Sequence, residues 1–254
     1  MKIRAGIDIG SVTTKCVIVK DGAVSGKALL RTSLDTERCA EDVLRKATEE
    51  AGIKTEEIKE IISTGYGRRQ FKRAGRIITE ISAVAKGGYL LGGETRCLIV
   101  DVGGQDTKVV EVDDKGEVTD FLMNDKCAAG TGRFLEIMAD VLETDIKGFS
   151  SLAMSSKNPV KINSTCSVFA ESEVISLITS STAREDIAAG LFNSIASRIA
   201  AMVRQFGHTD IIFFCGGGAK NPALKHSLER ILERDVVVLP EPQFVVAYGA
   251  AMTE

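Results

Sequence analysis

The sequence predicts an α/β protein, and three observations support that fold class. Apolar, β-branched runs alternate with longer segments whose apolar residues recur at helical spacing. One strand-turn-strand motif occurs twice, with Asp8 and Asp101 at equivalent positions 93 residues apart. The 254 residues are 44% hydrophobic and 26% charged, enough for one large or two smaller cores. Alternating strands and helices of this composition favour sheets covered by helices.

The repeat is the most informative feature of the chain. Residues 7–15, IDIGSVTTK, match residues 100–108, VDVGGQDTK, in Asp, Gly, Thr and Lys. In each copy an apolar run leads into D-x-G and a second apolar run follows, which predicts a β-hairpin with a glycine tip. The sequence therefore implies two related halves. We expect the boundary near residues 90–96, LLGGETR, and two domains covering residues 1–93 and 94–242.

The remaining elements follow from the periodicity of the apolar residues between and after the two hairpins. Strands are expected in IKEIISTGYG (58–67), at 210–215 and at 236–239. Helices are expected at 35–51, around 80–91, and at 131–142, 167–179, 183–206 and 222–233.

Composition and charge exclude several classes of function. The formal net charge is -3 and the Lys and Arg residues are scattered, so we expect no nucleic-acid partner. The N-terminus lacks a signal-like apolar region and no stretch approaches 18 uncharged apolar residues, so we expect a cytoplasmic protein without a membrane partner. The six cysteines form no C-x-x-C pair, which indicates free thiols in a reducing compartment.

Glycine tips of this kind suit a phosphate group, because glycine lets backbone N–H groups approach an anion closely. Asp8 and Asp101, which precede the tips, suit a Mg²⁺ ion held through waters. A third glycine run, FFCGGGAKNP (213–222), follows a strand and opens a helix, where an adenine or a ribose could lie against bare backbone. Any one motif could be a plain turn, but three together favour a nucleotide site. The candidate nucleotide-binding residues are Gly10, Ser11, Gly103, Gly104, Gly216, Gly217, Gly218, Ala219 and Asn221.

The three motifs GIDIGSVTTK, LIVDVGGQDTK and FFCGGGAKNPAL resemble those of the actin, Hsp70 and sugar-kinase superfamily of ATPases. The resemblance spans the chain and implies two RNase-H-like, actin-like ATPase domains with a nucleotide cleft between them. It implies that FVVAYGAAMTE, within residues 243–254, forms a final helix that completes the first domain. It also implies that Gln105 or Asp106 orients the attacking water. The residues implied to meet the phosphates of ATP or ADP are Thr13, Thr14 and Lys15.

Two cysteines stand at expected helix N-termini, Cys127 in NDKCAAGTGRFLE and Cys166 in STCSVFAESEVIS. The partial positive charge there favours a thiolate or an anionic iron–sulfur cluster. Four thiolates are needed for a Cys₄ cluster, and this pair supplies two. Either Cys39, Cys97 or Cys215 joins them, or a second subunit contributes the same pair, or both are inert thiols. We expect Cys16 and Cys97 to be buried packing residues.

MNDKCAAGTGRFLE and STCSVFAESEVIS are also similar to the BadF/BadG/BcrA/BcrD ATPase family, which includes the activators (component A, archerase) of 2-hydroxyacyl-CoA dehydratases. The resemblance implies a homodimer with one [4Fe-4S] cluster at its two-fold axis, held by Cys127 and Cys166 of both subunits. It implies that ferredoxin or flavodoxin donates an electron and that ATP drives its transfer to the dehydratase component. An oxygen-sensitive protein of anaerobic metabolism is expected.

One residue departs from that family pattern, and other functions stay open. Family activators commonly have histidine where this chain has Val84, while we expect His208 and His226 at the surface. Within the family, the chain could be a subunit of an ATP-dependent benzoyl-CoA reductase. A small-molecule kinase of the same superfamily would use a carboxylate such as Asp101 as a base, but it leaves Cys127 and Cys166 unexplained. An actin-like or Hsp70-like nucleotide switch is the other alternative.

Overall fold

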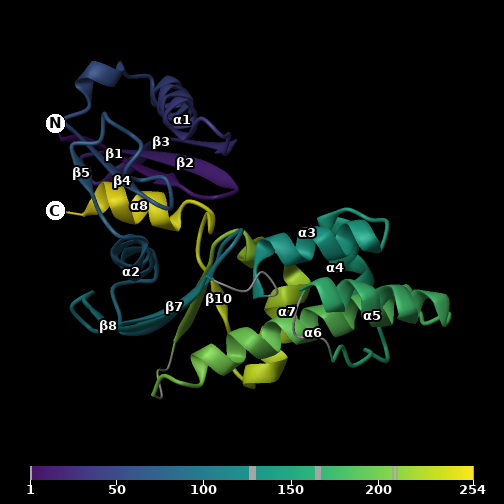
Figure 1. The fold of residues 1–254 in the computed structure, drawn as a ribbon. Coiled ribbons are helices and arrows are strands. Elements are labelled where there is room, and N and C mark those ends of the chain that lie inside the picture. Colours follow the sequence, from purple (N-terminus) through teal and green to yellow (C-terminus); the bar gives the residue numbers. More distant parts are fainter. Residues whose placement is uncertain (1, 126–129, 164–166, 208, 210, 254) are drawn as a thin grey trace. The chain divides into compact units, whose positions relative to one another are not determined.

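A computed structural model of the protein describes residues 2–125, 130–163, 167–207, 209 and 211–253. The described residues form two five-stranded sheets flanked by helices (Figure 1), which confirms the predicted α/β class. The chain divides into two compact units, and each is described by itself: one comprises Met1–Ile99, Val110–Phe121 and Leu239–Glu254, and the other comprises Val100–Val109 and Leu122–Val238. The domain boundaries expected from the sequence stay a prediction.

The first sheet has the strand order β3-β2-β1-β4-β5. Its strands are β1 (Ile3–Ile9), β2 (Thr13–Lys20), β3 (Ala23–Arg31), β4 (Glu60–Thr64) and β5 (Arg76–Ile77). The central strand, β1, runs antiparallel to β2 and parallel to β4, so Asp8 lies between Lys15 on one side and Thr64 on the other. The predicted first hairpin is confirmed.

Helices cover both faces of β1, which explains why the strand is buried almost throughout. The helices of this unit are α1 (Thr36–Ala51), α2 (Glu80–Leu91) and α8 (Val245–Met252), with a short 3₁₀ turn at Thr55–Glu57. Ile7 and Ile9 pack with α1, whereas α8, yellow in Figure 1, packs on the other face against Val17 and Val19. At Gly6 the backbone of α8 comes so close that a Cβ would lie 2.0 Å from the carbonyl oxygen of Ala247.

The second sheet has the strand order β10-β9-β6-β7-β8. Its strands are β6 (Cys97–Val102), β7 (Thr107–Val112), β8 (Val118–Asn124), β9 (Ile212–Cys215) and β10 (Val237–Val238). The helices that follow in sequence are α3 (Gly132–Val141), α4 (Ile146–Ser155), α5 (Ser167–Thr179), α6 (Arg184–Val203) and α7 (Pro222–Leu232), with a 3₁₀ turn at Gly218–Lys220. Strands β6 and β7 are neighbours in this sheet, which confirms the predicted second hairpin.

Helix α6 is long and apolar enough to cross a membrane by length and composition, with a mean hydropathy of 1.2 over its most apolar window. However, 61% of that window is buried inside the fold. Phe192 is fully buried and its ring lies 4.6 Å from that of Phe149 in α4, centroid to centroid. These contacts are those of a core helix.

The sequence patterns did not predict four elements, β3, β5, β8 and α4. Strands β3 and β8 are mostly partly or fully exposed and lack a clear alternation of apolar and polar residues, and β5 has two residues. Helix α4 (IKGFSSLAMS) is short and rich in serine and glycine, which are poor helix formers. Its Asp145 cap, which accepts a hydrogen bond from Gly148 N at 2.7 Å, was the sequence signal for this helix.

Candidate functional site

The tip of the first hairpin is fixed by a hydroxyl from β2 and one from the segment after β3. The backbone N–H of Gly10 donates to the Thr13 carbonyl at 3.2 Å, which closes the turn. Thr32 donates from Oγ1 to the Gly10 carbonyl at 2.8 Å and lies 2.9 Å from Thr14 Oγ1. Thr14 is fully buried and supports the tip from within, while Ser11 and Thr13 are partly exposed beside it.

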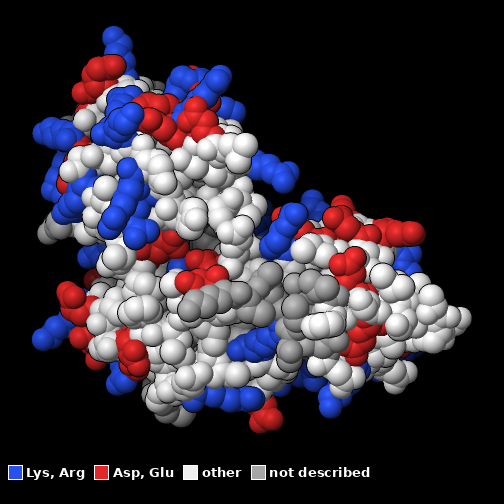
Figure 2. Space-filling view, viewed as in Figure 1, with Lys and Arg blue, Asp and Glu red and all other residues white. Residues whose placement is uncertain are grey.

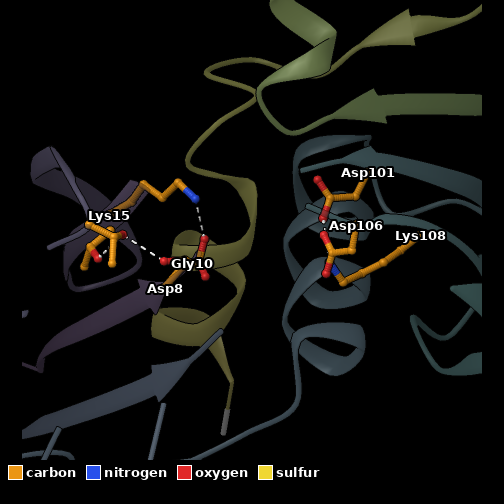
Figure 3. Close-up of polar contacts among 8 residues, drawn as sticks. Asp8, Gly10, Lys15, Asp101, Asp106 and Lys108 are labelled. Carbon is orange, nitrogen blue, oxygen red and sulfur yellow. Dashed lines mark hydrogen bonds and ion pairs between the residues drawn. The ribbon is translucent and has the colours of Figure 1, made fainter. Parts of the chain in front are cut away.

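Asp8 and Lys15 form a buried ion pair at this end of the sheet. Lys15 Nζ donates to Asp8 Oδ2 at 2.8 Å, and the two side chains are 14% and 8% exposed (Figure 3). An ammonium group beside a glycine turn can exchange its carboxylate partner for an anionic ligand. The arrangement thus provides a cation for an anion and a carboxylate for a hydrated metal ion.

The second hairpin repeats this pattern with one added carboxylate. Lys108 is 2% exposed, and its Nζ donates to Asp106 Oδ2 at 2.7 Å and lies 3.7 Å from Asp101 Oδ2 (Figure 3). The N–H of Gly103 donates to the Asp106 carbonyl at 2.9 Å. Gln105 is exposed at the tip. Of the two residues expected to orient a water, Asp106 is therefore engaged with Lys108.

The second tip also caps helix α3. The first N–H groups of a helix have no partner within it. Here Gly132 N donates to the Gly103 carbonyl and Arg133 N donates to the Gly104 carbonyl, both at 2.9 Å. Thr107 Oγ1 adds a 2.6 Å hydrogen bond to the Gly130 carbonyl. These hydrogen bonds connect the tip directly to the start of α3.

The third glycine run lies directly against the second aspartate. Gly216 has φ +80°, and a Cβ there would lie 2.4 Å from both Asp101 Oδ1 and the Val102 carbonyl oxygen, so only glycine fits. Cys215 is fully buried and its side chain hydrogen-bonds to Asp101; burial raises the pKa of this thiol well above its usual value. The run is thus a wall of the Asp101 site. Gly217 is exposed beside it.

A cavity of about 630 Å³ lies between α4 and the residues that follow the third glycine run. Its wall includes Ile146, Ser150 and Met154 from α4, together with Lys220 and Asn221. Asn221 caps α7 through Oδ1, at 3.0 Å from Ala223 N, while its buried Nδ2 has no hydrogen-bond partner among the described residues. A mostly apolar lining suits a flat heterocycle, and the volume falls in the usual range for small-ligand sites.

Cys127 and Cys166, the expected cluster ligands, lie outside the described residues. The four other cysteines are buried: Cys16, Cys39, Cys97 and Cys215 are between 0% and 5% exposed. Burial raises the pKa of Cys97 to about 12. The predicted packing role of Cys16 and Cys97 is confirmed, and no group of three or more His, Cys, Asp or Glu that could hold a metal ion occurs within the described part of the chain.

Val84 stands at the position where the family resemblance leads us to expect a histidine. Val84 is fully buried in α2, where its apolar side chain belongs to the core. His226 is exposed on α7, as predicted, while His208 lies outside the described residues.

The loop at residues 65–67, which the sequence predicts only as part of a strand, lies against Asp8 and Ile9. Gly65, directly after β4, has φ +92°, and a Cβ there would lie 2.6 Å from Asp8 Oδ1 and from the Ile9 carbonyl oxygen. At Gly67 a Cβ would lie 2.5 Å from Ile9 Cγ2. The signal was present in the sequence, because a G-x-G follows an apolar run here as it does at Gly216 and Gly218.

Comparisons with known proteins show which proteins this chain is similar to. The sequence profile of the BadF/BadG/BcrA/BcrD ATPase family matches residues 5–253. The activator of lactoyl-CoA dehydratase from Anaerotignum propionicum is 43% identical, over 97% of this chain and 95% of that protein. Two solved structures are similar: the activator of the 2-hydroxyisocaproyl-CoA dehydratase from Clostridium difficile with bound ADPNP (TM-score 0.91, 40% identity, 98% and 92% coverage of this chain and that one) and the (R)-2-hydroxyglutaryl-CoA dehydratase component A from Acidaminococcus fermentans (TM-score 0.94, 38% identity, 99% and 96% coverage).

Proposed function

Because the chain belongs to the BadF/BadG/BcrA/BcrD ATPase family, we propose that it activates a 2-hydroxyacyl-CoA dehydratase by ATP-dependent transfer of one electron. The electron passes through a [4Fe-4S] cluster shared by a homodimer. The observation that carries the proposal is the hydrogen-bonded connection from the second glycine tip to α3, since Gly103 and Gly104 accept from the first N–H groups of that helix. Nucleotide chemistry at the tip is thereby connected to the helix that follows Cys127.

The described residues fit MgATP. The Lys15 ammonium group, which pairs with Asp8, can pair with a phosphate oxygen instead. Gly10 and Gly103 carry no side chain that would block the approach of a phosphate to the backbone. The residues that would hold Mg²⁺ are Asp8 and Asp101, each through waters, because Mg²⁺ keeps most of its hydration shell in nucleotide sites. The cavity beside Asn221 accepts the adenine. When bound, Mg²⁺ neutralises charge that develops on the phosphates.

Water attack is assigned to the second hairpin. Gln105 is exposed and can orient the attacking water through its amide, whereas Asp106 already accepts from Lys108 at 2.7 Å. We therefore favour Gln105 over Asp106 for this role. The buried Lys108 lies beside both Asp101, near the end of β6, and Asp106, just before β7, as Figure 3 shows.

The cluster ligands are Cys127 and Cys166 of both subunits, which together supply four thiolates. The four other cysteines are buried among packing residues, so their donor atoms do not fit a shared cluster. Helix α5, which follows Cys166, supports a subunit interface beside it, because Phe169 and Ile175 are 68% and 50% exposed.

The proposed electron transfer at low potential requires an electron donor, an electron acceptor and a reducing compartment. Ferredoxin or flavodoxin supplies the electron, a dehydratase component receives it, and the reducing cytoplasm protects an oxygen-sensitive cluster. On the face that Figure 2 shows, Lys and Arg are interspersed with Asp and Glu.

The test is anaerobic purification followed by iron and sulfide analysis. We expect four iron and four sulfide per dimer, MgATP hydrolysis, and ATP-dependent activation of a purified 2-hydroxyacyl-CoA dehydratase in the presence of reduced ferredoxin. Saturable phosphorylation of a hydroxyl compound would instead establish the small-molecule kinase. ATP-dependent support of benzoyl-CoA reduction, without dehydratase activation, would establish the benzoyl-CoA reductase subunit.

A further inference from the structure

The internal repeat extends beyond the two hairpins to a third strand in each half. In one half β4 ends at Thr64 and continues as Gly65-Tyr66-Gly67; in the other β9 ends at Cys215 and continues as Gly216-Gly217-Gly218. The first glycine of each run has positive φ, +92° and +80°. The third glycine of each run lies against the residue after the aspartate, Ile9 or Val102.

In each half, the glycine loop lies close to the aspartate carboxylate of the hairpin. A Cβ on the first glycine would lie 2.6 Å from Asp8 Oδ1 in one half and 2.4 Å from Asp101 Oδ1 in the other. The residue before that glycine is therefore equivalent in the two halves. It is Thr64 beside Asp8 and Cys215 beside Asp101, where the Cys215 side chain hydrogen-bonds to the carboxylate.

Thr64 lacks the hydrogen bond that its counterpart makes. The residue is fully buried, and its Oγ1 has no hydrogen-bond partner among the described residues. Asp8 is its partner in the register of the parallel strands β1 and β4, so the two side chains stand on the same face of the sheet. Among the described residues Lys15 is the hydrogen-bond donor to Asp8, and it occupies Oδ2.

A buried hydroxyl without a partner destabilises a folded protein, because it has lost its hydrogen bonds to water. A side chain of the same shape without the hydroxyl would fit this position at no such cost. The hydroxyl therefore indicates a partner that it acquires in another state of the site.

We propose that Thr64 positions Asp8 in the nucleotide-bound state by donating a hydrogen bond from Oγ1 to the carboxylate. This inference rests on the proposed ATPase function. When Lys15 pairs with a phosphate, Asp8 loses the hydrogen bond from Lys15. The Thr64 hydroxyl then hydrogen-bonds to Asp8, as the Cys215 side chain does to Asp101. The carboxylate then keeps one orientation toward the waters of Mg²⁺. Thr64 is a positioning residue and touches neither the nucleotide nor the metal.

The experiment compares Thr64→Val, which removes the hydroxyl and keeps the β-branched shape, with Thr64→Ser, which keeps the hydroxyl. Thr48→Val is the matched control, because Thr48 is also buried and its Oγ1 donates to the Arg45 carbonyl within α1. The measurements are the Mg²⁺ concentration for half-maximal ATP hydrolysis, the affinities for MgATP and for ATP in EDTA, and the melting temperature of the nucleotide-free protein.

For Thr64→Val we expect the half-maximal Mg²⁺ concentration to rise about tenfold, which is the weakening that loss of one hydrogen bond to a charged group produces. Affinity for ATP in EDTA should stay within about twofold, and the melting temperature should be equal or higher, because the unpaired hydroxyl is gone. Thr64→Ser should restore the Mg²⁺ dependence, and Thr48→Val should leave it unchanged.

An unchanged Mg²⁺ dependence in Thr64→Val overturns the inference, and so does an equal weakening of ATP binding with and without Mg²⁺. A Thr64→Ser variant that is as impaired as Thr64→Val assigns the position to packing, and likewise overturns it. Wild-type protein that binds no MgATP overturns the ATPase proposal itself, so the two failures are distinguishable.

Discussion

Replacing Gly65 with alanine separates the two reasons why that position needs glycine. The residue has φ +92°, a conformation that costs an L-residue about 1 to 2 kcal/mol. In addition, the new Cβ would lie 2.6 Å from Asp8 Oδ1 and from the Ile9 carbonyl oxygen, and overpacking of this kind costs about 1 to 3 kcal/mol. The two costs together predict that the free energy of unfolding falls by about 2 to 5 kcal/mol.

The matched control is Gly22→Ala in the same unit. Gly22 has φ +88°, nearly the same backbone conformation, but nothing lies within 4 Å of its would-be Cβ. Only the first cost applies there, so we expect a loss of about 1 to 2 kcal/mol. The gain from a stiffer unfolded chain is common to both variants and cancels in their difference.

The assay is urea unfolding of the nucleotide-free protein, followed by circular dichroism, with MgATP affinity measured on the folded variants. The difference between the two variants reports the contact with Asp8 and Ile9. Because relief of that contact displaces Asp8, Gly65→Ala should also weaken MgATP binding, whereas Gly22→Ala should not. If Gly65→Ala loses no more stability than Gly22→Ala, the close approach of this loop to Asp8 is refuted.

Three further predictions test the proposed activity. Asp101→Ala should abolish MgATP hydrolysis while the circular dichroism spectrum is retained; undiminished turnover would remove Asp101 from the site. Thr107→Val removes the 2.6 Å hydrogen bond to Gly130, so ATP hydrolysis should persist while electrons transferred to the dehydratase per ATP fall severalfold; an unchanged ratio would exclude this coupling route. Cys127→Ser should lose the brown chromophore and weaken the dimer but still bind nucleotide, while Cys97→Ser should keep its iron, because Cys97 is fully buried in β6; four iron per dimer in Cys127→Ser would contradict the shared cluster.

Local patterns in the sequence were sufficient for the class of the fold and for many of its elements. The repeat around Asp8 and Asp101 predicted both hairpins, and the apolar periodicity predicted α1 and α6 to within a few residues. These predictions succeed because the periods of strands and helices depend on neighbours in the chain. Exposed strands such as β8 carry little of that signal, since few of their side chains are buried.

The sequence alone also determined which residues could carry chemistry, because the glycine tips, the aspartates and the cysteines are recognisable by type and spacing. The tertiary structure decided which of them act on one another. Thr64 meets Asp8 only through the parallel pairing of β4 with β1, and Gly216 meets Asp101 only because β9 belongs to the sheet of β6. Contacts of this kind join segments far apart in the chain, and their geometry follows from sheet order and register, which no local pattern encodes.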